Sequence, residues 1–188
     1  MHKHRFVIGL VLGVGLAVAV GSVEAREKPF HASFVGTFTN KDDFSFGGTP
    51  GSYVTVAGKS TLGPYTAQLV DEVSPDGQTC PLPGGGSGVE FVFAGEVGVL
   101  SFAEKGEQVF LTLSPSVTSH GCLDLATGVG TGQTTFDVSG GTGRFAGATG
   151  TIVKTWKYIV LAAPASPPGK GGFGSFTGTF DGTIELAQ

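Results

Sequence analysis

Apolar and polar residues alternate along much of the chain with the two-residue period of a β-strand. Segment 33–39 shows the pattern first, because Phe34, Gly36 and Phe38 alternate with three polar residues and a valine. The same alternation, interrupted by turn residues, predicts further strands at 52–61, 65–73, 89–94, 97–103, 108–114, 134–138, 151–163 and 173–186. The mixed period of 151–163 would also allow a helix, but its β-branched and aromatic residues favour a strand.

Turn residues separate these strands. The charged tip at 104–107 has a length that suits a β-hairpin, and Gly63-Pro64 marks a second hairpin. Loops are predicted at 40–51 and 164–172. Segment 74–88 holds three prolines and five glycines, which predicts a long irregular excursion. Segment 117–132 is predicted to be irregular strand or loop.

The first and last predicted strands carry nearly the same sequence, SFVGTF at 33–38 and SFTGTF at 175–180. About eight strands without helix-rich crossovers predict an all-β fold. Pairing of the first strand with the last would close an antiparallel β-barrel and leave no exposed edge. A β-sandwich is the alternative architecture.

Composition supports a turn-rich β-protein. Glycine supplies 33 of the 188 residues without the three-residue period of collagen, 40% of residues are hydrophobic and 14% are charged. The chain is apolar enough to form a packed core, and its length predicts a single domain over residues 26–188.

Residues 1–25 have the order of a secretory signal peptide. A basic head at 2–5 precedes an apolar body at 6–20, and Val23-Glu24-Ala25 predicts cleavage after Ala25. An uncleaved anchor is the alternative, but the apolar body is short for a membrane span. The pattern predicts a secreted or periplasmic protein that meets the membrane only during export.

An oxidising compartment predicts a disulfide between the two cysteines, Cys80 and Cys122. A metal site that includes His120 is the alternative, but the spacing is not that of usual zinc ligands, so no metal or other cofactor is predicted. Without residues 1–25, nine basic residues remain against fourteen acidic ones, a net charge of −5. This charge argues against a nucleic-acid partner.

A glycine-dense segment, GGTGRFAGATG at 140–150, joins two predicted strands. Gly141, Gly143 and Ala146 fit the dinucleotide-binding fingerprint, but no helix is predicted after them. No Asp or Glu occurs between Arg144 and Lys170 to bind a ribose. The segment is therefore predicted to be a backbone turn whose glycines adopt positive φ angles and whose Phe145 is anchored in the core.

Few side chains suggest a chemical site, and the sequence assigns no catalytic residue. Arg144 is predicted to form a structural salt bridge, with Asp137 as the candidate partner and a ligand anion as the alternative. Aromatic walls with few polar groups suit small apolar ligands. Four residues are the candidate lining of a barrel mouth, with ordinary core or surface positions as the alternative: Tyr65, Glu90, Trp156 and Tyr158.

The glycine segment resembles the GGxGxFxGAxG segment of the allene oxide cyclase barrel group and is similar to the GGTGxFxxARG segment of the dirigent proteins. The matching residues are Gly140, Gly141, Gly143, Phe145, Gly147, Ala148 and Gly150. Segment 178–184 also resembles the final strand of bacterial secreted relatives of this group. The resemblance implies an eight-stranded antiparallel barrel with an apolar cavity, which plant members use to bind and steer a reactive hydrophobic intermediate. Thr149 stands where dirigents carry arginine, and no catalytic role transfers.

Three functions follow as hypotheses. The first is a secreted, disulfide-bonded barrel that binds a small apolar molecule or has another non-catalytic role outside the cytoplasm. The second is an isomerase or cyclase, which requires an acid such as Glu90 to point into an apolar lumen. The third is a surface adhesion or interaction domain, which predicts a filled barrel and an exposed apolar patch.

Overall fold

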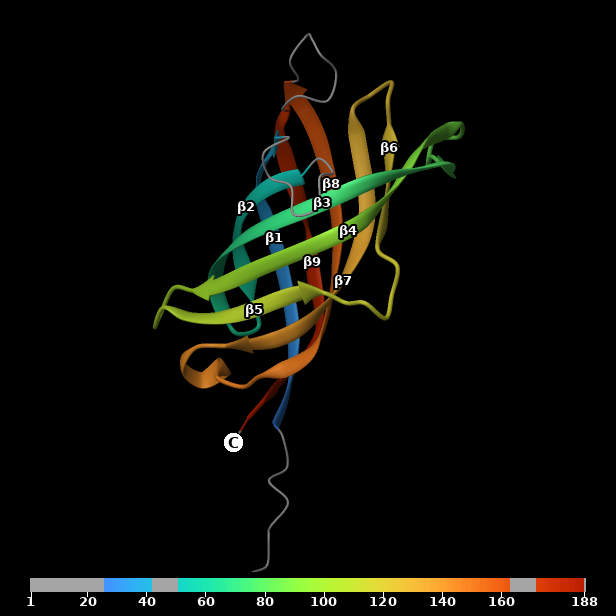
Figure 1. The fold of residues 1–188 in the computed structure, drawn as a ribbon. Helices are drawn as coiled ribbons and strands as arrows, with labels where there is room; N and C mark the ends of the chain where they lie inside the picture. The colour runs from blue at the N-terminus through green and yellow to red at the C-terminus, as the bar shows by residue number, and fades with distance from the viewer. Residues whose placement is uncertain (1–25, 42–50, 163–171, 188) are drawn as a thin grey trace, which may run out of the picture.

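The computed structural model describes residues 26–41, 51–162 and 172–187, and these form nine β-strands and one 3₁₀ helix (Figure 1). The elements are β1 (Arg26–Lys41), β2 (Gly51–Ser60), β3 (Gly63–Pro81), β4 (Ser87–Phe102), β5 (Glu107–Leu113), β6 (His120–Asp124), β7 (Val129–Gly141), η1 (Gly143–Phe145), β8 (Thr149–Ala162) and β9 (Gly172–Leu186). The predicted signal peptide and most of the predicted loops at 40–51 and 164–172 lie outside the described residues. No described segment forms a helix that is long and apolar enough to span a membrane.

The strands pair antiparallel and close into a ring. Around the barrel the order is β3, β2, β1, β9, β8, β7, β5 and β4, and β4 pairs back to β3. The first and last strands pair along almost their whole length, from Arg26 opposite Leu186 to Asn40 opposite Gly172. The prediction of a closed antiparallel β-barrel of about eight strands is confirmed, and the β-sandwich alternative is wrong.

One position in the ring is shared by two short strands placed end to end. β5 pairs with residues 97–102 of β4, and β6 pairs with residues 89–92 of the same strand. Both also pair with β7. Ser119 bridges the gap between β5 and β6. Its carbonyl accepts a hydrogen bond from the N–H of Phe93 at 3.0 Å, and its hydroxyl accepts one from the N–H of Thr135 at 3.0 Å. The segment predicted as irregular therefore contributes β6 to a continuous barrel wall.

The repeated first and last strands complement each other across the barrel seam. Phe34 lies opposite Gly178, and Gly36 lies opposite Phe176. A Cβ atom on Gly178 would stand 2.6 Å from the ring of Phe34, so the glycine leaves room for that ring. The rings of Phe34 and Phe176 stack with their centroids 5.6 Å apart. The repeat therefore packs two large side chains against two positions without side chains.

The predicted loop at 74–88 is wrong. β3 continues to Pro81 and pairs with β4 from Ser87 onward, which forms a long arm at the side of the barrel (Figure 1). Pro75 fits because the register shifts between Pro75 and Thr79, where the ladder is interrupted. Likewise, the strands predicted at 89–94 and 97–103 are one continuous strand, β4.

The disulfide between Cys80 and Cys122 is confirmed, and it ties the β3–β4 arm to β6. The Cα atoms of the two cysteines are 5.9 Å apart. Gly88 of β4 lies opposite Cys80, and a Cβ atom on this glycine would stand 2.8 Å from the sulfur of Cys122. A glycine is therefore needed where the disulfide passes over β4.

The barrel is packed with large apolar side chains at the end where β1 begins and β9 ends. The turn at 140–150 closes this end, and its glycines at 140, 143, 147 and 150 have φ angles of +122°, +60°, +70° and +135°. Phe145 is 1% exposed, and its ring lies 5.1 Å from that of Phe102. The glycines thus turn the backbone tightly enough to return an aromatic ring to the core.

Candidate functional site

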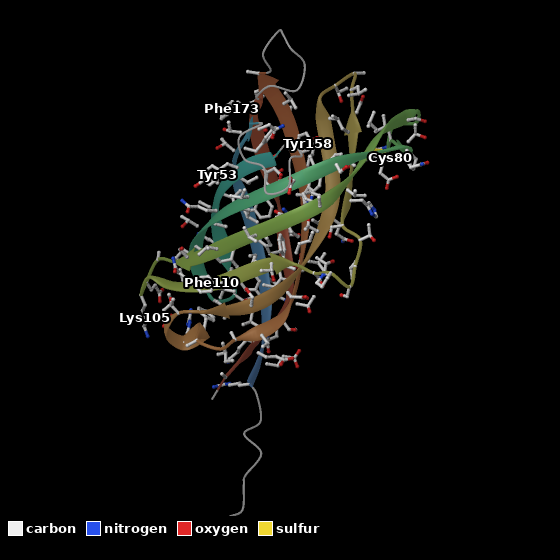
Figure 2. The ribbon with its side chains drawn as sticks, viewed as in Figure 1. Tyr53, Cys80, Lys105, Phe110, Tyr158 and Phe173 are labelled. Carbon is white, nitrogen blue, oxygen red and sulfur yellow. A yellow bond between two sulfur atoms is a disulfide. The ribbon has the colours of Figure 1, made fainter. Side chains whose placement is uncertain are left out.

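The opposite end of the barrel, between the arm and β8, holds a partly open cavity of about 240 Å³. Its walls are mainly aromatic, and the rings of Phe91, Tyr158 and Phe176 lie 5.7 to 6.0 Å from the ring of Trp156. Figure 2 shows Tyr158 in this half of the barrel. Phe38 and Phe93 complete the aromatic lining, while Asn40, Ser52, Asp71 and Lys154 supply polar atoms.

The polar groups come from directly paired positions on neighbouring strands. Ser52, Asp71 and Glu96 lie opposite one another across β2, β3 and β4. Lys154 reaches them from β8, and its Nζ donates a hydrogen bond to Oε1 of Glu96. The side chains of Lys154 and Glu96 are 1% and 0% exposed. The ion pair is therefore held inside the barrel, beside the cavity.

Aromatic rings surround the ammonium group of Lys154. Its Nζ lies 5.5, 5.2 and 5.6 Å from the ring centroids of Phe93, Phe136 and Phe176. These distances are within the range of cation–π attraction. The indole N–H of Trp156 donates to the hydroxyl of Thr134 at 3.2 Å, and Thr134 in turn lowers the pKa of Glu96. The cavity wall and the ion pair thus belong to one network.

Burial shifts the acids toward their neutral forms. It raises the pKa of Glu96, and the neighbouring Lys154 ammonium partly reverses this rise. Burial and the adjacent Glu96 raise the pKa of Asp71 to about 7, although its oxygen accepts a hydrogen bond from the N–H of Ser52 at 3.1 Å. Burial and the charge of Asp71 raise the pKa of the Tyr158 phenol to about 12. Both buried acids are therefore shifted toward the protonated form, and the pKa of Asp71 lies near neutral pH.

The sequence candidates divide between the cavity and other places. Trp156 and Tyr158 line the cavity. Tyr65 lies in the packed core instead, and its hydroxyl donates to the carbonyl of Ser33 at 3.2 Å. Glu90 does not contribute to the cavity, because its neighbours Val89 and Phe91 point there and alternation turns Glu90 to the opposite face.

Arg144 lies away from the cavity, and its partner is Glu107, not Asp137. Its Nε is 3.0 Å from Oε2 of Glu107, and its Nη2 donates to the carbonyl of Leu62 at 3.2 Å. The guanidinium also lies over the ring of Phe145, 4.7 Å from the centroid. These contacts hold the glycine turn against the hairpin tip, which is a structural role.

Sequence reasoning missed Asp71, Glu96 and Lys154. Each is a charged residue on the inward-facing side of a strand: Asp71 follows Ala67 and Leu69, Glu96 precedes Leu100 and Phe102, and Lys154 lies between Ile152 and Trp156. A charge at a position where alternation predicts an apolar residue was the available signal.

Comparison of the chain with protein-family models, curated proteins and solved structures gives no match. Within the described ranges, no group of three or more His, Cys, Asp or Glu side chains could hold a metal ion. The functional interpretation of the site is therefore argued from its geometry.

Removing one member of the buried ion pair should destabilise the barrel more than removing both. We expect Lys154→Met to lower the free energy of unfolding by about 3–5 kcal/mol, because it leaves Glu96 buried without a counter-charge. The double variant Lys154→Met/Glu96→Leu should recover most of that loss in urea titrations. Lys157→Met, on the exposed face of the same strand, is the matched control. Equal destabilisation of the single and double variants would contradict the pairing.

Asp71 should make the barrel less stable as pH rises from about 4 to about 7. The unfolded chain releases the Asp71 proton near its ordinary pKa of 3.8, whereas the folded protein keeps it up to about 7. The folded state binds more protons in this interval, so the contribution of Asp71 to the unfolding free energy falls by up to about 1.4 kcal/mol per pH unit.

Urea titrations of wild type and Asp71→Asn across this interval measure the effect as a difference in slope. Asp181→Asn is the contrasting variant, because the exposed Asp181 accepts a hydrogen bond from His31 that lowers its pKa. Its carboxyl is therefore ionised in both the folded and the unfolded state across this interval, and its removal should leave the slope nearly unchanged. Identical slopes for wild type and Asp71→Asn would show that Asp71 ionises normally in the folded protein.

Proposed function

We propose that the barrel binds a small, mainly apolar molecule in the cavity lined by Trp156 and Tyr158. The observation that supports this proposal is the contrast between the two ends of the barrel. One end is filled by side chains such as Phe145 and Phe180, whereas the other keeps about 240 Å³ open behind aromatic walls. Pockets for small ligands combine such walls with a few convergent polar groups, and here Asp71 and Lys154 supply them.

We further propose that the protein acts outside the cytoplasm and is related to the allene oxide cyclase barrel group. The disulfide supports the first statement, since such bonds persist in oxidising compartments. The closed barrel and its glycine turn support the second at the level of fold alone. The interaction-domain hypothesis is less well supported, because it predicts a filled interior and the interior is open at one end.

Acid–base isomerisation is the second candidate function, and Asp71 favours it. An isomerase of this kind requires an acid in an apolar lumen, and Asp71 takes the place that the sequence suggested for Glu90. Its raised pKa of about 7 suits proton transfer near neutral pH. Lys154 lies close enough to Asp71 to lower that pKa by its charge. The pair therefore offers a proton acceptor and a cation beside one cavity.

Ligand binding should depend on the open volume of the cavity. Val89→Phe should fill part of it and weaken an apolar ligand at least tenfold, whereas Val97→Phe places the same side chain on the exposed face of β4. Trp156 is the only tryptophan of the chain, so its fluorescence reports directly on the cavity. The titrant is 4-phenyl-1-butanol, together with any molecule that native mass spectrometry finds retained in the purified protein. Equal affinity in both variants would place binding elsewhere.

A catalytic cavity should exchange protons of a bound ketone. We expect the protein to accelerate deuterium incorporation next to the carbonyl of 4-phenyl-2-butanone, followed by NMR in D₂O, and Asp71→Asn to abolish the acceleration. The reason is that Asp71 would take the α-proton and return a deuteron. Binding of the ketone without faster exchange than in buffer would exclude this activity and leave the binding function intact.

A further inference from the structure

The charges beside the cavity do not cancel. Within the described part of the chain, two carboxylates, Asp71 and Glu96, share one ammonium group, that of Lys154. Lys154 forms its ion pair with Glu96, to which its Nζ donates a hydrogen bond. Asp71 lines the cavity and is bound by the neutral N–H of Ser52. When Asp71 is ionised, its negative charge therefore faces the open cavity, and no cation pairs with it directly.

We propose that the ligand of this cavity carries a protonated amine on an apolar body, and that Asp71 is its counter-ion. The proposal rests on the binding function proposed above and specifies its ligand class. A buried carboxylate needs a compensating cation or a proton, and an ammonium ligand supplies the cation from the open side. A carboxylate ligand would instead add a third negative charge next to Asp71 and Glu96.

The aromatic walls fit the same ligand. Trp156 and Tyr158 stack with centroids 5.7 Å apart, and Phe38 lies 5.1 Å from Tyr158. The charge of Asp71 acts on the phenol of Tyr158, which places these rings in the electrostatic neighbourhood of the carboxylate. Aromatic faces attract ammonium groups, and their apolar surface holds the remainder of the molecule. The repulsive charge of Lys154 is offset by Glu96, to which it is bonded.

Binding of an ammonium ligand should depend on pH through Asp71. The groups that face Asp71 are Ser52 on β2, Glu96 on β4, and Lys154 and Tyr158 on β8. Below a pKa of about 7, Asp71 must lose a proton before it can pair with the amine. The affinity should therefore fall about tenfold for each pH unit below 7 and level off above it.

The test compares three probes with the same apolar body: 4-phenylbutylamine, 4-phenyl-1-butanol and 4-phenylbutyrate. Calorimetry and Trp156 fluorescence at pH 8 should show the amine binding at least tenfold more tightly than the alcohol, and the acid binding most weakly. At pH 5.5 the amine should lose about thirtyfold in affinity, as expected 1.5 units below a pKa of about 7. The alcohol should change little.

Asp71→Asn should remove the advantage of the amine over the alcohol at pH 8, so that the two probes bind with similar affinity. Asp137→Asn is the matched control, because it removes one acid outside the cavity lining. If Asp71→Asn does not fold, the pH profile of the wild-type protein still decides. Binding of the alcohol as tightly as the amine at pH 8 overturns the amine proposal and leaves the binding function standing. Binding of none of the three probes overturns the binding function itself.

Discussion

The hydrogen-bonded ion pair between Glu96 and Lys154 lies where the apolar core of this barrel ends. Inside a protein, separated charges cost several kcal/mol each, and a charge without a partner costs most. Both side chains are essentially unexposed, so each needs the other in order to remain ionised. On one side of the pair the barrel is filled by aromatic rings, and on the other side lies the cavity. The pair thus forms a polar boundary between a structural half and an open half.

A register shift in β4 determines which side chains reach the open half. Glu72 pairs with Gly95 but Val73 pairs with Phe93, so Ala94 is an extra residue on β4. A bulge of this kind reverses the alternation of inward and outward positions along one strand. Glu96 therefore points inward below the shift, and Phe93, Phe91 and Val89 point inward above it. Without the shift, Glu90 would face the lumen in place of an aromatic wall.

Much of the fold could be predicted from the sequence, but little of the candidate site could. The barrel and its closure were predictable, because the Phe34–Gly178 and Gly36–Phe176 complementarity appears as the repeated SFxGTF. The cysteine pair was predictable because the sequence holds only two cysteines after a predicted signal peptide. Glu90 was the example of an acid for the lumen, but it lies on the face opposite Val89 and Phe91, which line the cavity. The long arm was missed because glycines and prolines normally end strands, whereas here a disulfide and a register shift hold them in one.

Asp71, Glu96 and Lys154 place charges inside the barrel, which apolar packing alone does not explain. Replacing a buried ion pair with apolar side chains of similar volume is often neutral or stabilising, and the other end of this barrel is filled mainly with apolar side chains. Sequences depart from local consistency mainly at functional sites. Asp71 is the clearest departure, since it adds a second carboxylate opposite Glu96 without adding a cation. We infer that its charge is compensated by a bound proton at low pH and by a cationic ligand at higher pH.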